Sequence, residues 1–133
     1  MVDYRTFPDA EALVLYHIRT SSTIVGDRAY SEIPKSPTYP LVVVRRIGGI
    51  PTIRQALDNA SLQIDVWAAT KAEAQEVAQE MRVTIHEAEG TTINTGTISG
   101  FVSAVDDSLG LTWSVDEDTQ HPRYTFGVSV SLH

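Results

Sequence analysis

Hydrophobic and polar residues alternate most regularly in residues 61–69 of the chain. Every second residue from Leu62 to Ala68 is apolar, while Gln63 and Asp65 occupy intervening positions. Side chains of a strand point to opposite faces in turn, so this period of two predicts a strand with one buried face.

A helix is predicted directly after this strand. Thr70 is placed to cap its first turn, and Glu73 completes a capping box three residues later. Gly90 is placed to serve as its C-cap. The apolar residues repeat near a period of 3.6 and form one stripe that can share a core with the strand: Ala74, Val77, Ala78, Met81, Ile85 and Ala88.

A second helix is predicted near the N-terminus, with Pro8 at its first position and Asp9 and Glu11 near the positive end of its dipole. His17 lies on its apolar face, without a second histidine or an acidic residue four positions away. We interpret His17 as a packed or edge-of-core side chain, with a ligand or proton carrier as the alternative. The stripe consists of Ala10, Leu13, Val14, His17 and Ile18, and residues 20–22 end the run.

The other segments predict a sheet rather than further helices. We expect strands over residues 24–33, 41–47, 97–105, 111–115 and 124–132, with loops over 34–40 and 91–95, a turn over 106–110 and an acidic loop over 116–122. The prediction is an α+β fold: a single domain over residues 1–133, in which a twisted, mostly antiparallel β-sheet carries two α-helices packed on one face.

The composition excludes several classes of function. A net charge of −7 disfavours nonspecific binding to nucleic-acid backbones, because phosphate contacts require lysine or arginine. The chain has no cysteine, which excludes thiol nucleophiles and zinc–thiolate sites. Its apolar runs are too short to span a membrane, and no signal peptide opens it, so we expect a soluble protein.

Motifs of common enzymes are absent, including glycine-rich phosphate loops and the Gly-x-Ser-x-Gly and His-Glu-x-x-His patterns. One acidic cluster could hold calcium or magnesium, although its spacing does not fit an EF-hand, and an exposed acidic loop is the simpler interpretation. We expect no enzyme activity, no catalytic residue, no metal and no cofactor. The cluster contains Asp106, Asp107, Asp116, Glu117, Asp118 and His121.

A basic segment contrasts with the acidic chain. Residues 41–57 contain three arginines and no acidic residue, and the apolar residues Ile50 and Ile53 border the arginines. A solvated strand end is one interpretation, and a contact surface for an acidic protein surface is the other. The candidate interface consists of Arg45, Arg46, Ile50, Ile53 and Arg54.

Four stretches carry a family resemblance over nearly the whole chain. They are Phe7-Pro-Asp-Ala-Glu-Ala-Leu13, the strand from Pro40 to Gly49, Asp65-Val-Trp-Ala-Ala-Thr-Lys-Ala-Glu-Ala74, and the ending from Gly110 to Phe126 with its tryptophan, acidic loop and Pro-Arg-Tyr. In these the chain resembles the tail terminator proteins of long-tailed (siphovirus-type) phages that infect actinobacteria.

The resemblance implies a structural virion protein. Such a protein forms a hexameric ring on the head-proximal end of the tail tube, stops tube polymerisation and provides a docking surface for the head–tail connector. The implied partners are other copies of the chain, the tail tube protein and the connector (stopper) protein. DNA would pass through the lumen without specific binding, no membrane is involved, and assembly would take place in the host cytoplasm.

Within that role, a ring needs two different surfaces on each subunit. We hypothesise that the basic residues Arg45, Arg46 and Arg54 meet the acidic loop of the next subunit, so that reversing Arg45 and Arg46 to glutamate abolishes the ring while the monomer stays folded. Alternatively, the acidic loop lines the lumen. The face with Ser129 and Ser131 meets a neighbour, the tube or water. Rival functions are another head–tail joining or tail-completion protein, and a metal-dependent binding module.

Overall fold

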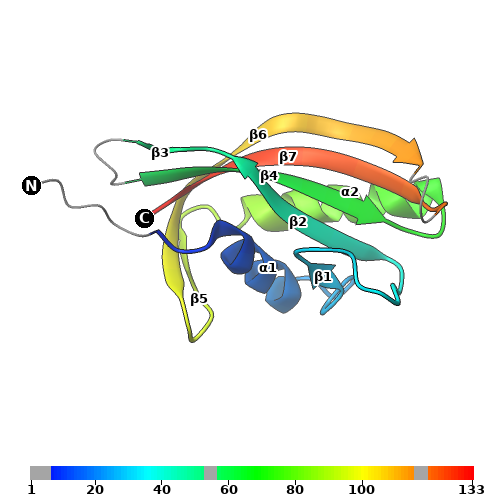
Figure 1. The fold of residues 1–133 in the computed structure, drawn as a ribbon, viewed down its shortest axis with the longest axis horizontal. Helices are drawn as coiled ribbons and strands as arrows, with labels where there is room; N and C mark the ends of the chain where they lie inside the picture. The colour runs from blue at the N-terminus through cyan, green and yellow to red at the C-terminus, as the bar shows by residue number, and fades with distance from the viewer. Residues whose placement is uncertain (1–6, 53–56, 116–119) are drawn as a thin grey trace, which may run out of the picture.

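The computed structural model describes residues 7–52, 57–115 and 120–133. One curved sheet arches over two helices, which lie together beneath it (Figure 1). We call the face that carries the helices the inner face and the opposite one the outer face. This α+β architecture confirms the fold class expected from the sequence.

The elements follow one another along the chain in an order that alternates helices with strands. Their bounds are α1 (Ala10–Ser21), β1 (Ala29–Tyr30), β2 (Leu41–Gly48), β3 (Pro51–Thr52), β4 (Leu57–Trp67), α2 (Lys71–His86), β5 (Thr91–Asn94), β6 (Ser99–Val115) and β7 (Pro122–Leu132).

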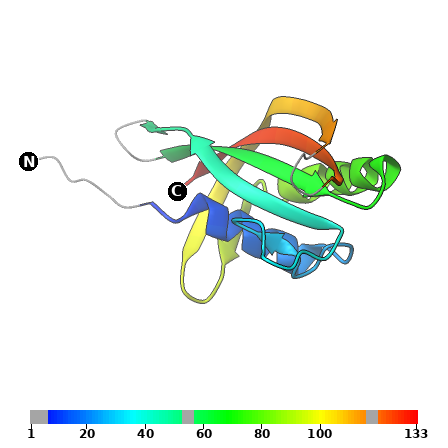
Figure 2. The ribbon, with the colours of Figure 1, turned by 45° about the vertical axis from the view of Figure 1, so that its right-hand side comes forward.

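The sheet has the strand order β1-β2-β4-β7-β6-β5, and β3 pairs with β4 beside the end of β2. Its pairs are antiparallel except for β1 with β2. The hairpin of β5 and β6 extends away from the body beside α1, which is clearest after rotation (Figure 2).

Both helices form because one stripe of each is apolar, as the sequence predicts. In α2 the side chain of Thr70 accepts a hydrogen bond from the Glu73 N–H, so the expected N-cap is confirmed. The helix ends at His86, before Gly90, which instead adopts a positive φ of 79° in the following turn. In α1 the N-cap is Asp9, so Pro8 precedes the helix instead of beginning it.

His17 joins the two helices. Its Nε2 lies 2.8 Å from the carbonyl oxygen of Thr84, so this nitrogen carries the proton and donates. The side chain is half-buried, which confirms the expected packed or edge-of-core histidine.

The main core fills the space between the inner face and the helices. Leu62, Ile64 and Val66 of β4 are fully buried there, against the stripe of α2. The sequence predicted that β4 buries only one face, but Asp65 and Trp67 on its outer face are buried as well. Trp67 packs there in a second cluster with Leu41 and Val43.

Three predictions about strands were wrong. Residues 24–33 form strand only at Ala29–Tyr30, whereas residues 91–94, expected as loop, form β5. The turn expected over residues 106–110 lies inside β6, where register shifts between residues 102 and 112 accommodate it. Pairing with β7 therefore overrides the local turn signal of the aspartates and glycine.

Candidate assembly interface

Arg45 and Arg46 lie on opposite faces of the sheet although they are neighbours in sequence. Arg46 points to the inner face, where the N-terminal end of α1 lies, and Arg45 points to the outer face. This division follows from the alternation of side chains along β2. The basic segment is therefore two separate sites instead of one continuous surface.

The inner site is built around the buried carboxylate of Asp58. Arg46 donates from both terminal nitrogens to the two oxygens of Asp58, at 2.7 Å each. The same guanidinium donates to the carbonyls of Gly48 and Gly49, at 2.9 and 3.1 Å. Hydrogen bonding to Asp58 raises the pKa of Arg46 above its ordinary value, although burial opposes the shift. Arg46 thus fixes the end of β2 and is not a free positive charge.

A hollow of about 450 Å³ lies beside this pair, lined by residues 7–11 together with Arg46, Pro51 and Asp58. Within its wall, the backbone N–H of Arg46 donates to Glu11 of α1 at 2.7 Å. This contact occupies a strand N–H that has no partner strand on that side in the described part of the chain, where β1 pairs with Val42 and Val43.

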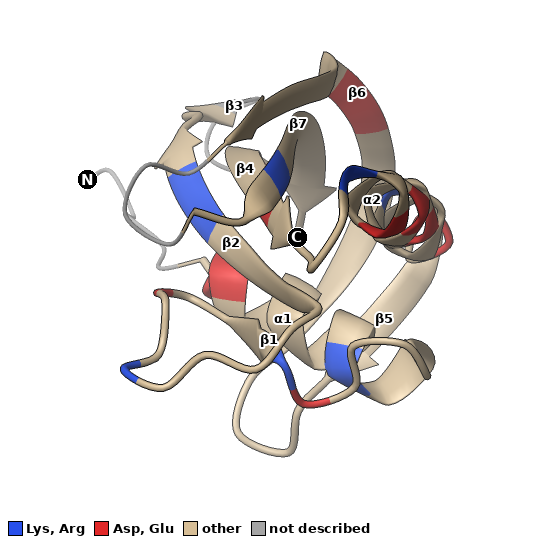
Figure 3. Cartoon of the chain, turned by 90° about the vertical axis from the view of Figure 1, so that its right-hand side faces the viewer, with Lys and Arg blue, Asp and Glu red and all other residues tan. Residues whose placement is uncertain are grey.

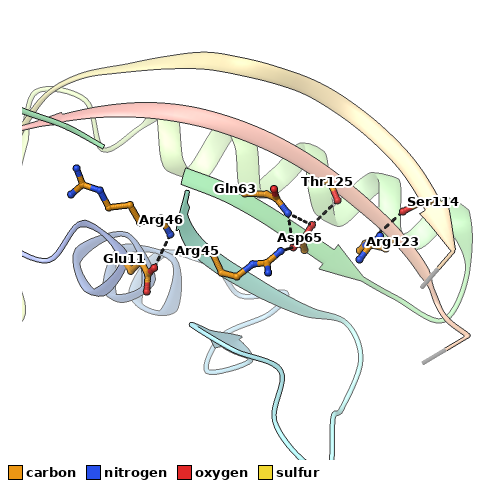
Figure 4. A network of polar contacts seen from close by, with 8 residues as sticks. All are labelled: Glu11, Arg45, Arg46, Gln63, Asp65, Ser114, Arg123 and Thr125. Atoms are coloured by element: carbon orange, nitrogen blue, oxygen red, sulfur yellow. Dashed lines mark hydrogen bonds and ion pairs between the residues drawn. The ribbon is translucent and has the colours of Figure 1, made fainter. Parts of the chain in front are cut away.

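The outer site is a polar network around Asp65, whose side chain is only 1% exposed (Figure 4). Arg45 donates to it at 2.9 Å, Thr125 of β7 at 2.6 Å and Gln63 at 3.2 Å. About half of the Arg45 side chain remains exposed. Arg45 can therefore contact a partner while it keeps the buried carboxylate neutralised.

Arg123 of β7 brings a second guanidinium to the same region. It lies over the ring of Trp67, at 5.9 Å from the centroid, and donates to Ser114 of β6 at 3.1 Å. A hollow of about 380 Å³ separates it from Arg45, with Glu32, Ile33, Val43, Asp65 and Trp67 also lining it. Two guanidinium groups thus border one concavity on the outer face.

The aspartates of β6 are also divided between faces. Asp107 is directed to α2, where it accepts from Arg82 at 2.5 and 3.1 Å and contacts His86 at 2.9 Å. Hydrogen bonds from Arg82 and then His86 hold the pKa of the Asp107 carboxyl below its ordinary value. Asp106 is opposite Ser129 and shares the outer face with it. It is exposed and makes no ion pair with any residue in the described ranges.

Figure 3 shows basic residues on β2 and β7 and acidic residues on β6, whereas α2 carries both. Large apolar side chains are exposed next to β3 and on β6. Ile47 and Ile50 lie next to β3, at 63% and 71% exposure. Leu109, Trp113 and Val115 are exposed on β6.

The predicted site residues Ile53, Arg54, Asp116, Glu117 and Asp118 lie outside the described residues. Of the cluster considered for metal binding, His121 stacks on Tyr39 with ring centroids 3.9 Å apart. The described part of the chain contains no group of three or more histidine, aspartate or glutamate residues arranged to hold a metal ion. No helix in that part is long and apolar enough to cross a membrane.

Sequence reasoning missed Asp58 and Asp65 as partners of the arginines. The alternating pattern placed Asp65 on the polar face of its strand, but its contact with Arg45 depends on β2 pairing with β4 in one particular register. The available signal was the opposite charge of these residues, because arginines on one strand and aspartates on the next are expected to pair across a sheet.

Comparison with known proteins places this fold in a family. Residues 14–126 match the family described as tail completion protein gp17. Among solved structures, a chain of the virion of a native gene transfer agent (GTA) particle has the same fold, with a TM-score of 0.60 and 12% identity over 92% of this chain and 93% of that one. No curated protein matches the chain. Because the family match spans most of the sequence, the chain belongs to the tail completion protein gp17 family and is a structural, non-enzymatic protein of a phage virion.

Proposed function

We propose that this protein is the tail terminator: a hexameric ring that caps the head-proximal end of the tail tube, stops its polymerisation and receives the head–tail connector. The observation that carries the proposal is the placement of two unlike surfaces on one subunit. A closed ring requires such a heterologous interface, in which one surface of each copy meets a different surface of the next.

The first surface, which we call the arm end, comprises Arg45, Ile47 and Ile50 with the neighbouring β3. The second, which we call the edge end, comprises exposed residues of β6: Asp106 and Leu109 on its outer face, and Trp113 and Val115 on its inner face. In Figure 1, β3 lies towards one end of the long axis of the molecule and the C-terminal end of β6 towards the other. Both expose apolar side chains, and Arg45 of the arm end is opposite in charge to Asp106 of the edge end, so we take the arm end of one copy to contact the edge end of the next.

The remaining partners follow from the proposed position. The two rims of the ring would contact the tail tube protein and the connector (stopper) protein. DNA would pass through the lumen without specific binding, because the net charge of −7 per subunit disfavours attraction to phosphates. In this arrangement Asp106 and the acidic residues Asp116, Glu117 and Asp118 belong to the subunit interface or the lumen wall, and Ile53 and Arg54 extend the arm end.

Native mass spectrometry over a range of protein concentrations tests the ring. We expect a hexamer, either alone or on addition of isolated tail tubes, whose capped ends are then visible by electron microscopy. Ile50→Asp should prevent both, since it puts a charge into an apolar contact, whereas Val83→Asp on the exposed side of α2 should prevent neither.

A protein that stays monomeric and leaves tube ends bare would contradict the terminator role. Copurification with portal-side proteins instead of the tube protein would then favour another head–tail joining protein of the connector.

A further inference from the structure

Arg123 is held in place on the outer face by its neighbours on both sides. It lies directly opposite Trp67 of β4 and Ser114 of β6 in the sheet. Its guanidinium carbon lies 5.9 Å from the centroid of the Trp67 ring, and its Nε donates to Ser114 at 3.1 Å (Figure 4). Trp67 is buried and packs in the second cluster, so it is a firm support. The guanidinium therefore has a defined position before any partner binds.

The terminal nitrogens of Arg123 have no acceptor among the described residues. Its Nε alone donates, and it makes no ion pair in that part of the chain. Arg45 is similar, since one of its nitrogens donates to Asp65 and the others donate to no described residue. Asp65 accepts from Thr125 and Gln63 as well, so its carboxylate is already satisfied. Unused N–H donors therefore border the hollow of the outer face on two sides.

A carboxylate suits a hollow of this kind, because it accepts paired hydrogen bonds from planar guanidinium groups. The volume of about 380 Å³ accommodates an acidic side chain with part of its backbone. Ile33 is 44% exposed and adds an apolar wall that a peptide can contact. Nucleic acid fits less well, because the net charge of −7 repels phosphates and the two arginines of the lining are too few to follow a phosphate backbone.

Glu32 opposes the binding of an anion. It lines the hollow, is exposed and makes no ion pair with any described residue. The other carboxylate of the lining, Asp65, is compensated by Arg45. Removing the charge of Glu32 should therefore strengthen the binding of a carboxylate, whereas removing an arginine should weaken it.

The acid of the proposed edge end does not fit into the hollow of the next copy. Asp106 lies on the outer face of its own subunit, as the hollow does. Successive subunits of a six-membered ring differ by a sixth of a turn, so their outer faces cannot point toward each other. Asp106 can meet Arg45 from the side, but it cannot project between Arg45 and Arg123. The tail completion role implies contact with other virion proteins, and these are the remaining source of an acidic segment.

We propose that the hollow between Arg45 and Arg123 binds the carboxylate of an acidic peptide segment that belongs to another virion protein. Arg123 binds with its terminal nitrogens, and Arg45 binds with its unused nitrogens while it stays paired with Asp65. The inference goes beyond the proposed ring, because one subunit supplies the whole lining of the hollow.

Two short blocked peptides test the chemistry of the site, one with a glutamate between alanines and the other with a glutamine in its place. Each is titrated into the isotope-labelled protein and followed by NMR. We expect the glutamate peptide to shift the Nε–H signals of Arg45 and Arg123, and the glutamine peptide to shift neither. A double-stranded oligonucleotide should also leave both signals unchanged, and a shift on its addition would assign the hollow to nucleic acid and overturn the proposal.

Substitutions in the hollow should act with opposite signs. We expect Arg123→Gln to weaken binding of the glutamate peptide about tenfold, because it removes charged donors. Arg82→Gln removes the same charge from α2, on the other side of the sheet, and should change the affinity much less. Glu32→Gln should tighten binding about twofold at low salt and less at high salt. Circular dichroism shows whether each variant is folded, and Arg123→Lys, which keeps a charge over Trp67, replaces Arg123→Gln if that variant is not.

The outcomes separate this inference from the proposed function, because Arg123 belongs to neither the arm end nor the edge end. A hexamer that forms normally while the glutamate peptide fails to bind, or binds equally well to Arg123→Gln, overturns the carboxylate site and leaves the ring in place. If Arg123→Gln prevents the hexamer, the hollow receives a second copy and its assignment to another protein is wrong. A protein that binds the glutamate peptide through Arg123 but forms no ring, alone or on tubes, supports the site while the terminator proposal fails.

Discussion

Arg46 donates two hydrogen bonds of 2.7 Å to the two oxygens of Asp58, a carboxylate that is almost completely buried. Removing Arg46 would leave that carboxylate without its counter-charge inside the fold. We expect Arg46→Ala to lower the free energy of unfolding by about 3 kcal/mol, as measured by urea denaturation.

Arg45→Ala is the matched control, because Asp65 would keep its hydrogen bonds from Thr125 and Gln63. We expect a loss of about 1 kcal/mol there. Equal losses in the two variants would contradict the distinction between an internal and a surface arginine. The hypothesis that both arginines can be reversed without unfolding the monomer is revised accordingly: Arg46→Glu would face Asp58 and Glu11, so the assembly test uses Ile50 instead.

Gly49 is required where β2 turns toward β3. Its φ is +92°, and a Cβ at this position would lie 1.8 Å from the carbonyl oxygen of Asn59. We expect Gly49→Ala to cost about 3 kcal/mol by thermal or chemical unfolding, since the backbone must move to relieve the clash. Gly48→Ala meets nothing within 4 Å and should change stability by less than about 1 kcal/mol. A tolerated Gly49→Ala would show that the backbone between β2 and β3 changes its conformation freely.

Asp107 gives the stability of the protein a limited acid dependence. Hydrogen bonds from Arg82 and then His86 lower the pKa of Asp107 in the folded state. The ionised carboxylate therefore contributes to the free energy of unfolding above the unfolded-state pKa of about 4. The contribution is lost as pH falls through the lower folded-state pKa. Because the group is 41% exposed, the effect should stay below about 1 kcal/mol.

We therefore expect Asp107→Asn to be less stable than the parent chain between about pH 5 and pH 8. The difference in the free energy of unfolding should shrink below about pH 4. Unfolding curves across this pH range measure it. Asp106→Asn, which loses no ion pair of the described chain, is the control, and a similar pH dependence in that variant would exclude the assigned cause.

The helices and the buried faces of β4 and β7 could be predicted from sequence because each depends on a local period. The stripe of α2 from Ala74 to Ile85 is buried as expected. Segments whose structure depends on a distant partner were missed. β5 is strand because Thr91 to Asn94 lies against Ser99 to Val102, and the Asp106–Gly110 segment stays extended because β7 pairs with it.

The candidate site shows the same division between local and distant information. Charge pattern alone identified Arg45 and Arg46, and alternation places them on opposite faces of a strand. Their carboxylate partners are distant in sequence, so the pairing of Arg46 with Asp58 needed the three-dimensional register. The continuous strand β6 likewise could not be predicted, because the sequence suggested two short strands with a turn between them.

Among the described residues, one strand N–H at each edge of the sheet is bonded to a carboxylate of the same chain. Glu11 accepts from Arg46 on β2, and Glu89 accepts from Val105 on β6. An edge N–H without an acceptor is available to strands of other molecules, so these contacts limit unspecific edge association. We expect Glu11→Ala and Glu89→Ala each to lower stability by about 1 kcal/mol and to increase aggregation, measured by light scattering during slow heating. Glu76→Ala, on the exposed side of α2, should behave like the parent chain. If the three variants aggregated equally, the carboxylates would have no protective role at the edges, and the order of the sheet alone would have to keep the subunits from associating wrongly.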